Sequence, residues 1–300
     1  MHVHIAALLR ILFCLFPIAG AALEVVSGYV TGAGSTFTLD TANTNNSFTV
    51  RSSNPQKNAW LLEKWAYNDT ANGVLRVHSP RMHDNVQGIR TRIVANNTEP
   101  LMGATAGMNH RQRIFPQDTL IVEQTGSAAN IDTAHLLIYY EDLPGSVARF
   151  IDMPTLIANQ VNRLHQEVSV TTTAASGQYS GQVAINSSYD FLVANTDYAL
   201  IGAICDTRVG TIRIQGVDSG NLGLGIPGEP TQRHVGANWF ARLSTAFGVP
   251  LIPVFNSANK GAILIDCTGH TAAITSVITL ELVQLAPKGG ATNSGGQYAM

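Results

Sequence analysis

Short apolar runs recur along most of the chain, each about seven residues long and rich in β-branched side chains. Gly, Asn, Asp and Pro bound these runs, as is typical of β-strands joined by turns. The runs cover residues 35–41, 47–53, 73–79, 88–94, 119–125 and 135–141, and after a break 167–173, 211–217, 250–255, 262–268 and 277–285. The pattern predicts an all-β protein.

Two sequence blocks occur twice, in the same order. "DTANGVLRV" (69–77) matches "DTRVGTIRI" (206–214), and "LIVEQTGSAANI" (120–131) matches "ILIDCTGHTAAI" (263–274). The blocks lie 51 residues apart in the first half and 57 in the second. Because two collinear matches rarely arise by chance, they predict an internal duplication.

The repeated positions are interpreted as structural. Each second block is expected to end its strand in a Thr-Gly turn whose glycine supplies a positive φ. The two repeated arginines are expected to point out of the sheet and to pair with an acid or a loop carbonyl. The repeat-equivalent positions are Asp69, Thr70, Gly73, Arg76, Glu123, Thr125 and Gly126 in the first copy and Asp206, Thr207, Gly210, Arg213, Asp266, Thr268 and Gly269 in the second.

The duplication predicts domain boundaries. The copies span 25–143 and 168–286, with a connector at 144–167 and a Gly/Ser/Asn-rich, flexible arm at 287–300. In the connector, Asp152 can cap a helix that tolerates Pro154 in its first turn. Apolar residues at helical spacing extend this predicted amphipathic helix, namely Met153, Leu156, Ile157, Val161 and Leu164.

Each copy has room for about eight short strands, which fits a jelly roll or an immunoglobulin-like sandwich. The immunoglobulin pattern of Cys, Trp and Cys is absent from the sequence. Long excursions occupy corresponding places in the two copies, at 96–117 and 216–245. We therefore predict two tandem jelly-roll barrels or sandwiches joined by a short helical connector.

The N-terminal segment, residues 1–24, allows more than one interpretation. It holds a 13-residue apolar run, Ile11 to Leu23, and the small residues at 19–21 fit a signal-peptide cleavage site. A retained apolar arm explains the same pattern. A membrane-spanning helix fits less well, because Arg10 and Pro17 interrupt a run that is already short.

Composition narrows the classes of partner. Charged residues make up 13% of the chain, apolar residues 45%, and the net charge is −2. This balance gives no general attraction to nucleic acid or anionic lipid and suits a subunit that hides its surface against neighbours. The cysteines, Cys14, Cys205 and Cys267, have neither disulfide-framework nor zinc-site spacing, so we expect buried free thiols.

No catalytic constellation stands out. Residues 223–228 satisfy GxGxxG but lack a following helix, so we interpret them as a loop. His78, His83, His110 and His135 lack the close spacing of metal ligands and are interpreted as scattered loop residues. Glu123 and Asp266 belong to different copies, which argues against a glycosidase pair. We expect no enzyme activity, cofactor or metal.

A local group of arginines could face nucleic acid, but it lacks interleaved aromatic residues and a basic total charge. Inter-subunit ion pairs or solvated loops are the preferred interpretation. The group comprises Arg81, Arg90, Arg92, Arg111 and Arg113.

Over residues 25–286 the chain resembles the double jelly-roll major capsid proteins of tailless icosahedral viruses, including membrane-containing bacteriophages and the adenovirus-like lineage. The resemblance rests on the tandem architecture and the repeated blocks. It implies a non-enzymatic shell subunit whose homotrimer presents six similar barrels as a pseudo-hexagonal block.

The resemblance also implies partners and a location, the virion. The partners are copies of the chain, neighbouring capsomers, penton and other minor capsid proteins, and an internal membrane reached by the N-terminal arm, without sequence-specific nucleic-acid binding. The alternative is a secreted two-module β-sandwich that binds carbohydrate or a cell surface. That alternative accounts for the signal-like start and for N-x-S/T sequons at Asn45, Asn68, Asn96 and Asn186.

Overall fold

The computed structural model describes residues 20–31, 38–39, 47–51, 57–67, 73–82, 88–93, 112–124, 131–172, 178–206, 209–228, 234–269 and 273–287. Antiparallel β-strands dominate this part of the chain, which confirms the all-β prediction. The strands form four sheets, two from each half of the chain. We call them the first sheet pair (β1–β9) and the second sheet pair (β10–β18).

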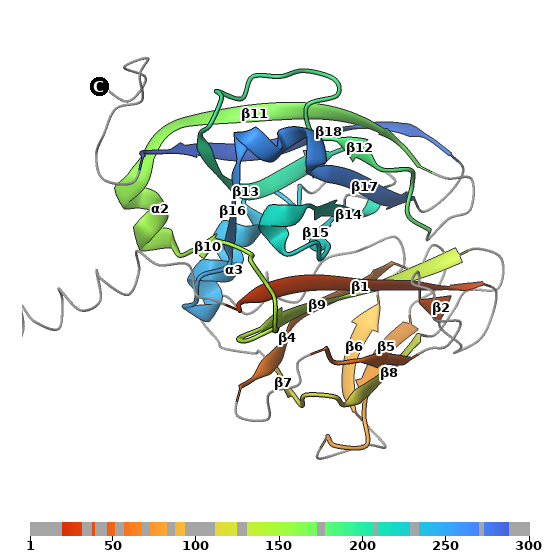
Figure 1. The fold of residues 1–300 in the computed structure, drawn as a ribbon. Helices are drawn as coiled ribbons and strands as arrows, with labels where there is room; N and C mark the ends of the chain where they lie inside the picture. The colour runs from red at the N-terminus through yellow and green to blue at the C-terminus, as the bar shows by residue number, and fades with distance from the viewer. Residues whose placement is uncertain are drawn as a thin grey trace, which may run out of the picture.

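The first sheet pair consists of a five-stranded sheet and a four-stranded sheet (Figure 1). The larger has the order β2-β1-β9-β4-β7, formed by β1 (Ala22–Thr31), β2 (Thr38–Leu39), β4 (Ala59–Tyr67), β7 (Gln112–Ile114) and β9 (Ile131–Tyr140). The smaller has the order β3-β8-β5-β6, formed by β3 (Ser47–Thr49), β5 (Gly73–His78), β6 (Ile89–Ile93) and β8 (Thr119–Gln124).

The second sheet pair has the same composition. Its larger sheet has the order β10-β16-β13-β18-β11, formed by β10 (Phe150–Ile151), β11 (Gln160–Thr171), β13 (Asp197–Cys205), β16 (Ile252–Asn256) and β18 (Thr275–Leu285). Its smaller sheet has the order β12-β17-β14-β15, formed by β12 (Val183–Ala184), β14 (Val209–Gln215), β15 (Leu224–Pro227) and β17 (Leu264–Gly269).

The two sheet pairs share one topology when the additional edge strands β2 and β10 are left out and the remaining eight strands of each pair are counted in chain order. In both, the larger sheet takes the first, eighth, third and sixth strands in that order, and the smaller takes the second, seventh, fourth and fifth. Both also break register where the third strand pairs with the eighth, between Leu61 and Glu63 in β4 and between Leu200 and Gly202 in β13. β4 and β13 thus share a local irregularity at the equivalent place, and a β-bulge of this kind bends its strand.

Burial follows the two-residue period of the strands. In β5, Leu75 and Val77 are fully buried, whereas Val74 before them and Arg76 between them are only partly buried. One apolar core fills the first sheet pair, and a larger one fills the second and extends onto the outer face of the first pair's larger sheet. That sheet is therefore covered on both faces, which explains why β4 is buried along almost its whole length, Glu63 and Lys64 included.

Four short helices complete the described fold: α2 (Met153–Asn159), α3 (Trp239–Phe247) and the 3₁₀ turns η2 (Val217–Ser219) and η3 (Ser257–Ala262). The capping prediction for α2 is confirmed, because the Asp152 carboxylate accepts a hydrogen bond of 2.9 Å from the Thr155 amide. The predicted length is wrong. Val161 and Leu164 lie in β11, where Val168 and Val170 are buried at a spacing of two.

Several element boundaries differ from the expected ones. β1 begins at Ala22, before residue 25, where the first copy was predicted to begin, and β11 begins at Gln160, before the apolar run noted at 167–173. Helix α3 begins within the segment 216–245, predicted as a long excursion, and ends two residues beyond it. Its glycine-rich flanks gave no helix signal, although Phe240, Leu243 and Phe247 bury one face at helical spacing.

The described cysteines behave as predicted. Cys205 and Cys267 are free and buried, and burial raises the pKa of the Cys267 thiol to about 12. Cys14 lies outside the described residues. Within the described ranges, no helix has both the length and the apolar character needed to cross a membrane.

Candidate functional site: the interface between the sheet pairs

The outer face of the first pair's larger sheet packs against the smaller sheet of the second pair, where β1 meets β15 (Figure 1). The Val25 amide donates a hydrogen bond of 2.7 Å to the Gly223 carbonyl. A Cβ added to Gly225 would lie 2.4 Å from the Val25 Cβ, and real Cβ atoms do not approach that closely. Gly225 is therefore required by the close approach of two sheets.

This contact also explains the GxGxxG sequence. The loop prediction for residues 223–228 is wrong, because Leu224–Pro227 is strand β15. A Cβ at Gly223 would lie 2.6 Å from the Arg213 side chain, so this glycine too makes room for a neighbour. The motif serves the packing of two sheets: its central residues Leu224–Pro227 form a strand, whereas a dinucleotide site needs a glycine turn that leads into a helix.

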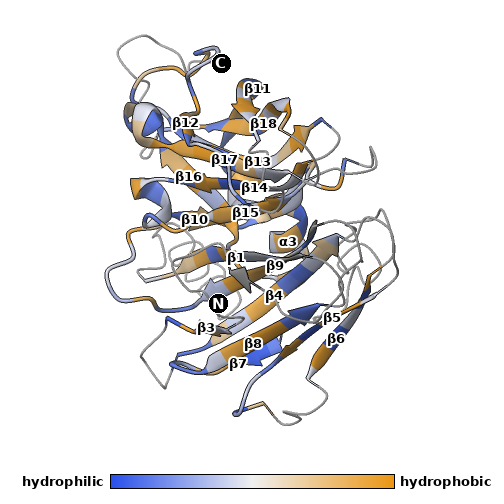
Figure 2. Ribbon diagram, turned by 90° about the vertical axis from the view of Figure 1, so that its right-hand side faces the viewer, coloured by the Kyte–Doolittle hydropathy of each residue, from blue (hydrophilic) through white to orange (hydrophobic). Residues whose placement is uncertain are grey.

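Trp65 of β4 is one of two buried tryptophans at the interface and is 1% exposed. Its indole Nε1 donates a hydrogen bond of 2.9 Å to Thr211 Oγ1 in β14. Its ring meets Trp239 of α3 edge-on, with centroids 5.7 Å apart, and the Trp239 indole donates to the Gly225 carbonyl at 3.0 Å. Figure 2 shows α3 at this junction, where it joins both sheet pairs.

A second polar group crosses the same interface. His135 of β9 stacks on Trp65, and its Nδ1 lies 2.8 Å from Ser27 Oγ. Ser27 Oγ also lies 2.6 Å from the Tyr179 hydroxyl, which belongs to the second half of the chain. His135 is fully buried in a strand, so its interpretation as a loop histidine is wrong. Buried polar groups that are hydrogen-bonded fix one relative placement of the sheets.

Arg213 of β14 contributes a buried ion pair beside this group. Its Nε and Nη2 atoms donate to the two Asp266 oxygens at 3.0 and 2.7 Å, across neighbouring strands in direct register. The guanidinium also lies 3.5 Å from the centroid of the Tyr179 ring. Burial raises the pKa of Asp266 above its ordinary value, while Arg213 acts in the opposite direction.

The equivalent pair in the first copy, Arg76 and Glu123, has the same arrangement in a more open setting. The two residues face each other in register across β5 and β8 and are joined by hydrogen bonds. Their side chains are 29% and 25% exposed, compared with 20% and 1% for Arg213 and Asp266. Both repeated arginines thus pair with an acid, as expected, and Glu123 and Asp266 are their partners.

The remaining repeat positions lie in or beside strands. The Asp206 carboxylate accepts from the Val277 amide at 2.9 Å, and the buried Thr268 hydroxyl accepts from the Thr211 amide at 3.0 Å. The predicted Thr-Gly turn is wrong in the second copy, because Thr268 and Gly269 are still in β17 and Gly269 has no positive φ. A Cβ there would press on Thr172, at 3.1 Å.

Gly73 and Gly210 lie in β5 and β14. Five repeat positions are outside the described residues: Asp69, Thr70, Thr125, Gly126 and Thr207.

The other chemistry considered in the sequence is dispersed. Within the described ranges, no three His, Cys, Asp or Glu side chains gather as a metal site requires. Arg81 and Arg113 lie against the Phe115 ring, at 4.9 and 5.4 Å from its centroid, and Arg81 donates to the Pro116 carbonyl. His83, His110 and Arg111 are outside the described residues.

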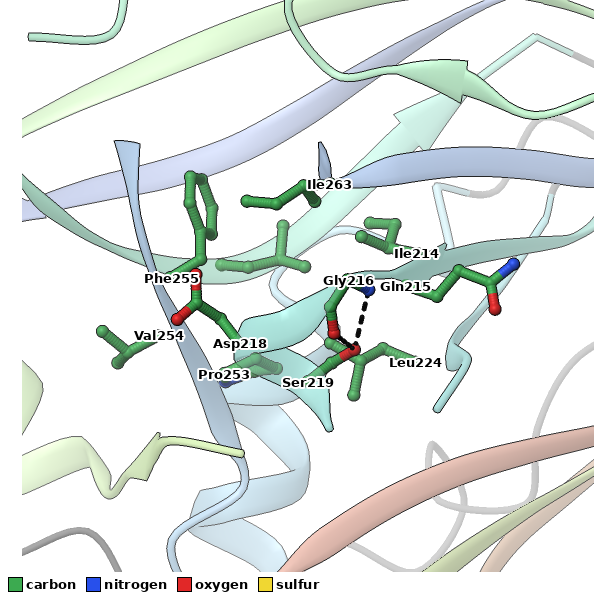
Figure 3. A pocket seen from close by; sticks show the side chains of 11 residues that line it. Ile214, Gln215, Gly216, Asp218, Ser219, Leu224, Pro253, Val254, Phe255 and Ile263 are labelled. Carbon is green, nitrogen blue, oxygen red and sulfur yellow. Dashed lines mark hydrogen bonds between the residues drawn. The ribbon is translucent and has the colours of Figure 1, made fainter. Parts of the chain in front are cut away.

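A small hollow lies in the second sheet pair, with apolar walls from Ile214, Phe255 and Ile263 (Figure 3). Its volume of about 20 Å³ has room for about one water molecule. Ser219 at its edge is bonded within its own turn, accepting from the Gly216 amide at 3.1 Å. The hollow is too small for a substrate.

No family model and no curated protein matches the sequence. The chain is similar to the solved structure of the PBSX exported protein XepA, with 10% identity over 89% of this chain and 88% of that one and a TM-score of 0.24. It is also similar to the major capsid protein P2 from bacteriophage PM2, with 7% identity over 90% of this chain and 100% of that one and a TM-score of 0.22. A third similar structure is an infectious bursal disease virus VP2 subviral particle, with 12% identity over 93% of this chain and 74% of that one and a TM-score of 0.22. TM-scores this low do not establish a common function.

Proposed function

We propose that this chain is the structural subunit of a virus-type protein shell. Its two sheet pairs are jelly rolls that arose by duplication, spanning about 25–143 and 168–286 with a connector between them. Three copies form a homotrimer whose six similar modules make a pseudo-hexagonal block. In this proposal the chain works by packing against copies of itself and has no catalytic role.

The observation that carries the proposal is the topology shared by the two sheet pairs. A strand order of first-eighth-third-sixth facing second-seventh-fourth-fifth is that of a jelly roll with its first and last strands adjacent. The equivalent register breaks in β4 and β13 support duplication. The ion pairs Arg76–Glu123 and Arg213–Asp266 support it further, because each joins repeat-equivalent positions.

The interface supports a role as a rigid building block. Hydrogen bonds from Trp65 to Thr211 and from Val25 to Gly223 hold the two sheet pairs in one placement. A block that tiles a shell needs its modules fixed, because neighbours must meet the same surface each time. Low charge suits such a subunit, since charged residues are depleted at interface cores.

In this proposal the chain is located in the virion, and its neighbours are other capsomers, penton and minor capsid proteins. The apolar segment of residues 1–24 contacts an internal membrane or a neighbouring subunit. Electron microscopy of the purified protein tests the role. Threefold blocks with a hexagonal outline are expected, and a monomer at every concentration would reject the shell subunit.

One observation favours the second candidate, a secreted carbohydrate-binding protein. Tyr189 and Phe191 are 54% and 61% exposed and stack with their ring centroids 5.8 Å apart. Exposed aromatic rings are surfaces on which apolar faces of other molecules can pack. Glycan-array binding that is lost in Tyr189→Ala and Phe191→Ala would support this candidate, and unchanged binding would reject this pair as the platform.

A further inference from the structure

Strand β11 lies at one edge of the second pair's larger sheet, and among the described strands β18 is its only partner (Figure 1). The direction of its outward amides follows from two hydrogen bonds. The Ser169 amide donates to Ser188 Oγ at 3.1 Å, and Val277, directly opposite Ser169 in β18, donates away from β11 to Asp206. Ser169 and Val277 are therefore a non-hydrogen-bonded pair, and the odd-numbered residues of β11 direct their backbone groups out of the sheet.

The outward edge is open over a defined interval. At the N-terminal end of β11, a register break between Gln160 and Asn162 ends the regular ladder. At the other end, the Ser169 amide already donates its hydrogen bond to the Ser188 hydroxyl. The three outward-directed residues between these limits are Arg163, His165 and Glu167. No residue of the described chain bonds to their backbone groups. An open ladder of this kind is a template for another strand.

The centre of the open interval is His165, and the charges around it are self-complementary. Arg163 and Glu167 both lie on the exposed face of β11, two residues before and after His165. A twofold axis through His165 would pair each strand antiparallel with its copy and place Arg163 opposite Glu167 of the other copy, twice. The limits of the edge and the positions of the charges thus select the same register.

Arg163 is already held in position for such a contact. Its Nη2 atom donates to Asn238 Oδ1 at 3.0 Å and to Glu281 Oε1 at 3.2 Å, while its side chain stays 52% exposed. The other guanidinium nitrogens can serve a second carboxylate. Between Arg163 and Glu167 the strand has no register break, and it has neither a proline nor a lysine, which commonly protect edges.

We propose that β11 is a contact surface for a second copy of this chain. Two β11 strands pair antiparallel about a twofold axis at His165, so that two five-stranded sheets become one continuous sheet. Backbone hydrogen bonds from Arg163, His165 and Glu167 supply the affinity, and the crossed Arg163–Glu167 pairs fix the register. This contact does not rest on the proposed shell function. In a shell it would join neighbouring trimers.

Disulfide cross-linking tests the register directly. In a hydrogen-bonded antiparallel pair the Cα atoms are about 5.5 Å apart, within the range that a disulfide spans. His165→Cys is expected to give a covalent dimer on mild oxidation. Thr171→Cys is the matched control, because it lies on the same strand and face but would sit about 40 Å from its copy at about 3.3 Å per residue.

The unsubstituted chain measures any background from the native cysteines. At least a tenfold higher dimer yield for His165→Cys than for Thr171→Cys supports the proposal, and equal yields overturn it. Equal yields would also be seen if another protein or another part of this chain occupied the edge.

Charge changes give a second test that needs no cysteine. Glu167→Arg places like charges opposite each other in the homodimer, and so does Arg163→Glu. Each variant alone is expected to lose dimer affinity about tenfold or more in analytical ultracentrifugation, whereas an equimolar mixture regains it, because the mixed dimer restores both opposite-charge pairs. A mixture no better than its components overturns the register.

His165→Pro covers the case in which Arg163→Glu is unstable through its contact with Glu281. Proline at an outward amide leaves the β11–β18 ladder intact and removes one intermolecular hydrogen bond. A dimer that tolerates this change without loss of affinity overturns the proposal.

Cross-linking at His165 without threefold blocks would leave this contact standing and reject the shell function. Threefold blocks without cross-linking would support the shell function and reject this contact.

Discussion

Trp65 and Thr211 lie 146 residues apart in the chain, and the indole of the first donates a buried hydrogen bond of 2.9 Å to the hydroxyl of the second. This bond joins the larger sheet of the first pair to the smaller sheet of the second. It lies among Val25, Gly225 and Trp239, all of which are buried. The two sheet pairs therefore behave as one body.

A double-mutant cycle measures this coupling. Trp65→Phe and Thr211→Val each remove one partner of the bond, and each is expected to lower the free energy of unfolding by about 1–3 kcal/mol, because the remaining partner stays buried. The double variant should lose about 1 kcal/mol less than the sum of the single losses. Urea unfolding followed by circular dichroism gives the values, and strict additivity would contradict a direct contact.

The two repeated ion pairs should differ in their effect on stability. Arg213→Met leaves the Asp266 carboxylate, 1% exposed, without its partner, which is expected to cost about 3–5 kcal/mol. Arg76→Met leaves Glu123, 25% exposed and open to water, at a cost of about 1 kcal/mol or less. The same unfolding experiment compares the two variants. Equal losses would show that Asp266 is not buried as described.

Gly225→Ala tests the close approach of β15 to β1. The added methyl group would lie 2.4 Å from the Val25 Cβ, so the sheets must separate, and an expected loss of about 1–3 kcal/mol follows. Gly181→Ala is the matched control, because a Cβ there meets nothing within 4 Å. Its stability should stay within about 0.5 kcal/mol of the parent. Thermal unfolding of both variants checks this, and an unchanged Gly225→Ala protein would be inconsistent with the interface.

The buried Glu24 makes the stability of the first sheet pair depend on pH. Burial raises the pKa of Glu24 above its ordinary value of 4.5, against the lowering effect of Arg51 and Tyr140. Its ionised form is therefore less favourable in the folded chain than in the unfolded one. Its contribution to stability is fully present below the unfolded pKa and is lost as the pH rises through the folded pKa.

Glu24→Gln removes this titration. The free energy of unfolding of the variant, minus that of the parent, should become more positive as the pH rises from about 4 to about 8. Urea unfolding at several pH values measures the difference. A difference that becomes more negative over this interval would mean that the pKa of Glu24 is lowered.

The alternation of apolar residues predicted much of the fold because it reflects which face of a strand is buried. Leu75 and Val77, with Ile212 and Ile214, repeat at a spacing of two and lie in the two cores. Helix α2 was predicted too long because the apolar positions of β11 at 161 and 164 coincide with helical spacing.

The interface could not be predicted in the same way. Trp65 lies in a strand that is buried along almost its whole length, and its sequence neighbours Glu63 and Lys64 give no sign that its outer face meets α3 and β14. The requirement for Gly225 depends on Val25, two hundred residues earlier in the sequence. The repeated arginines could be predicted because they occur at the same position in both repeated blocks, whereas Ser27 and Tyr179 lie outside these blocks.

The most direct measurement is the mass and shape of the purified protein, obtained by native mass spectrometry and electron microscopy of one preparation. The account predicts a homotrimer, three times the mass of one chain, with threefold symmetry and a hexagonal outline. A chain that remains monomeric up to the highest concentration tested, with no assembly in the images, would contradict the proposed shell function.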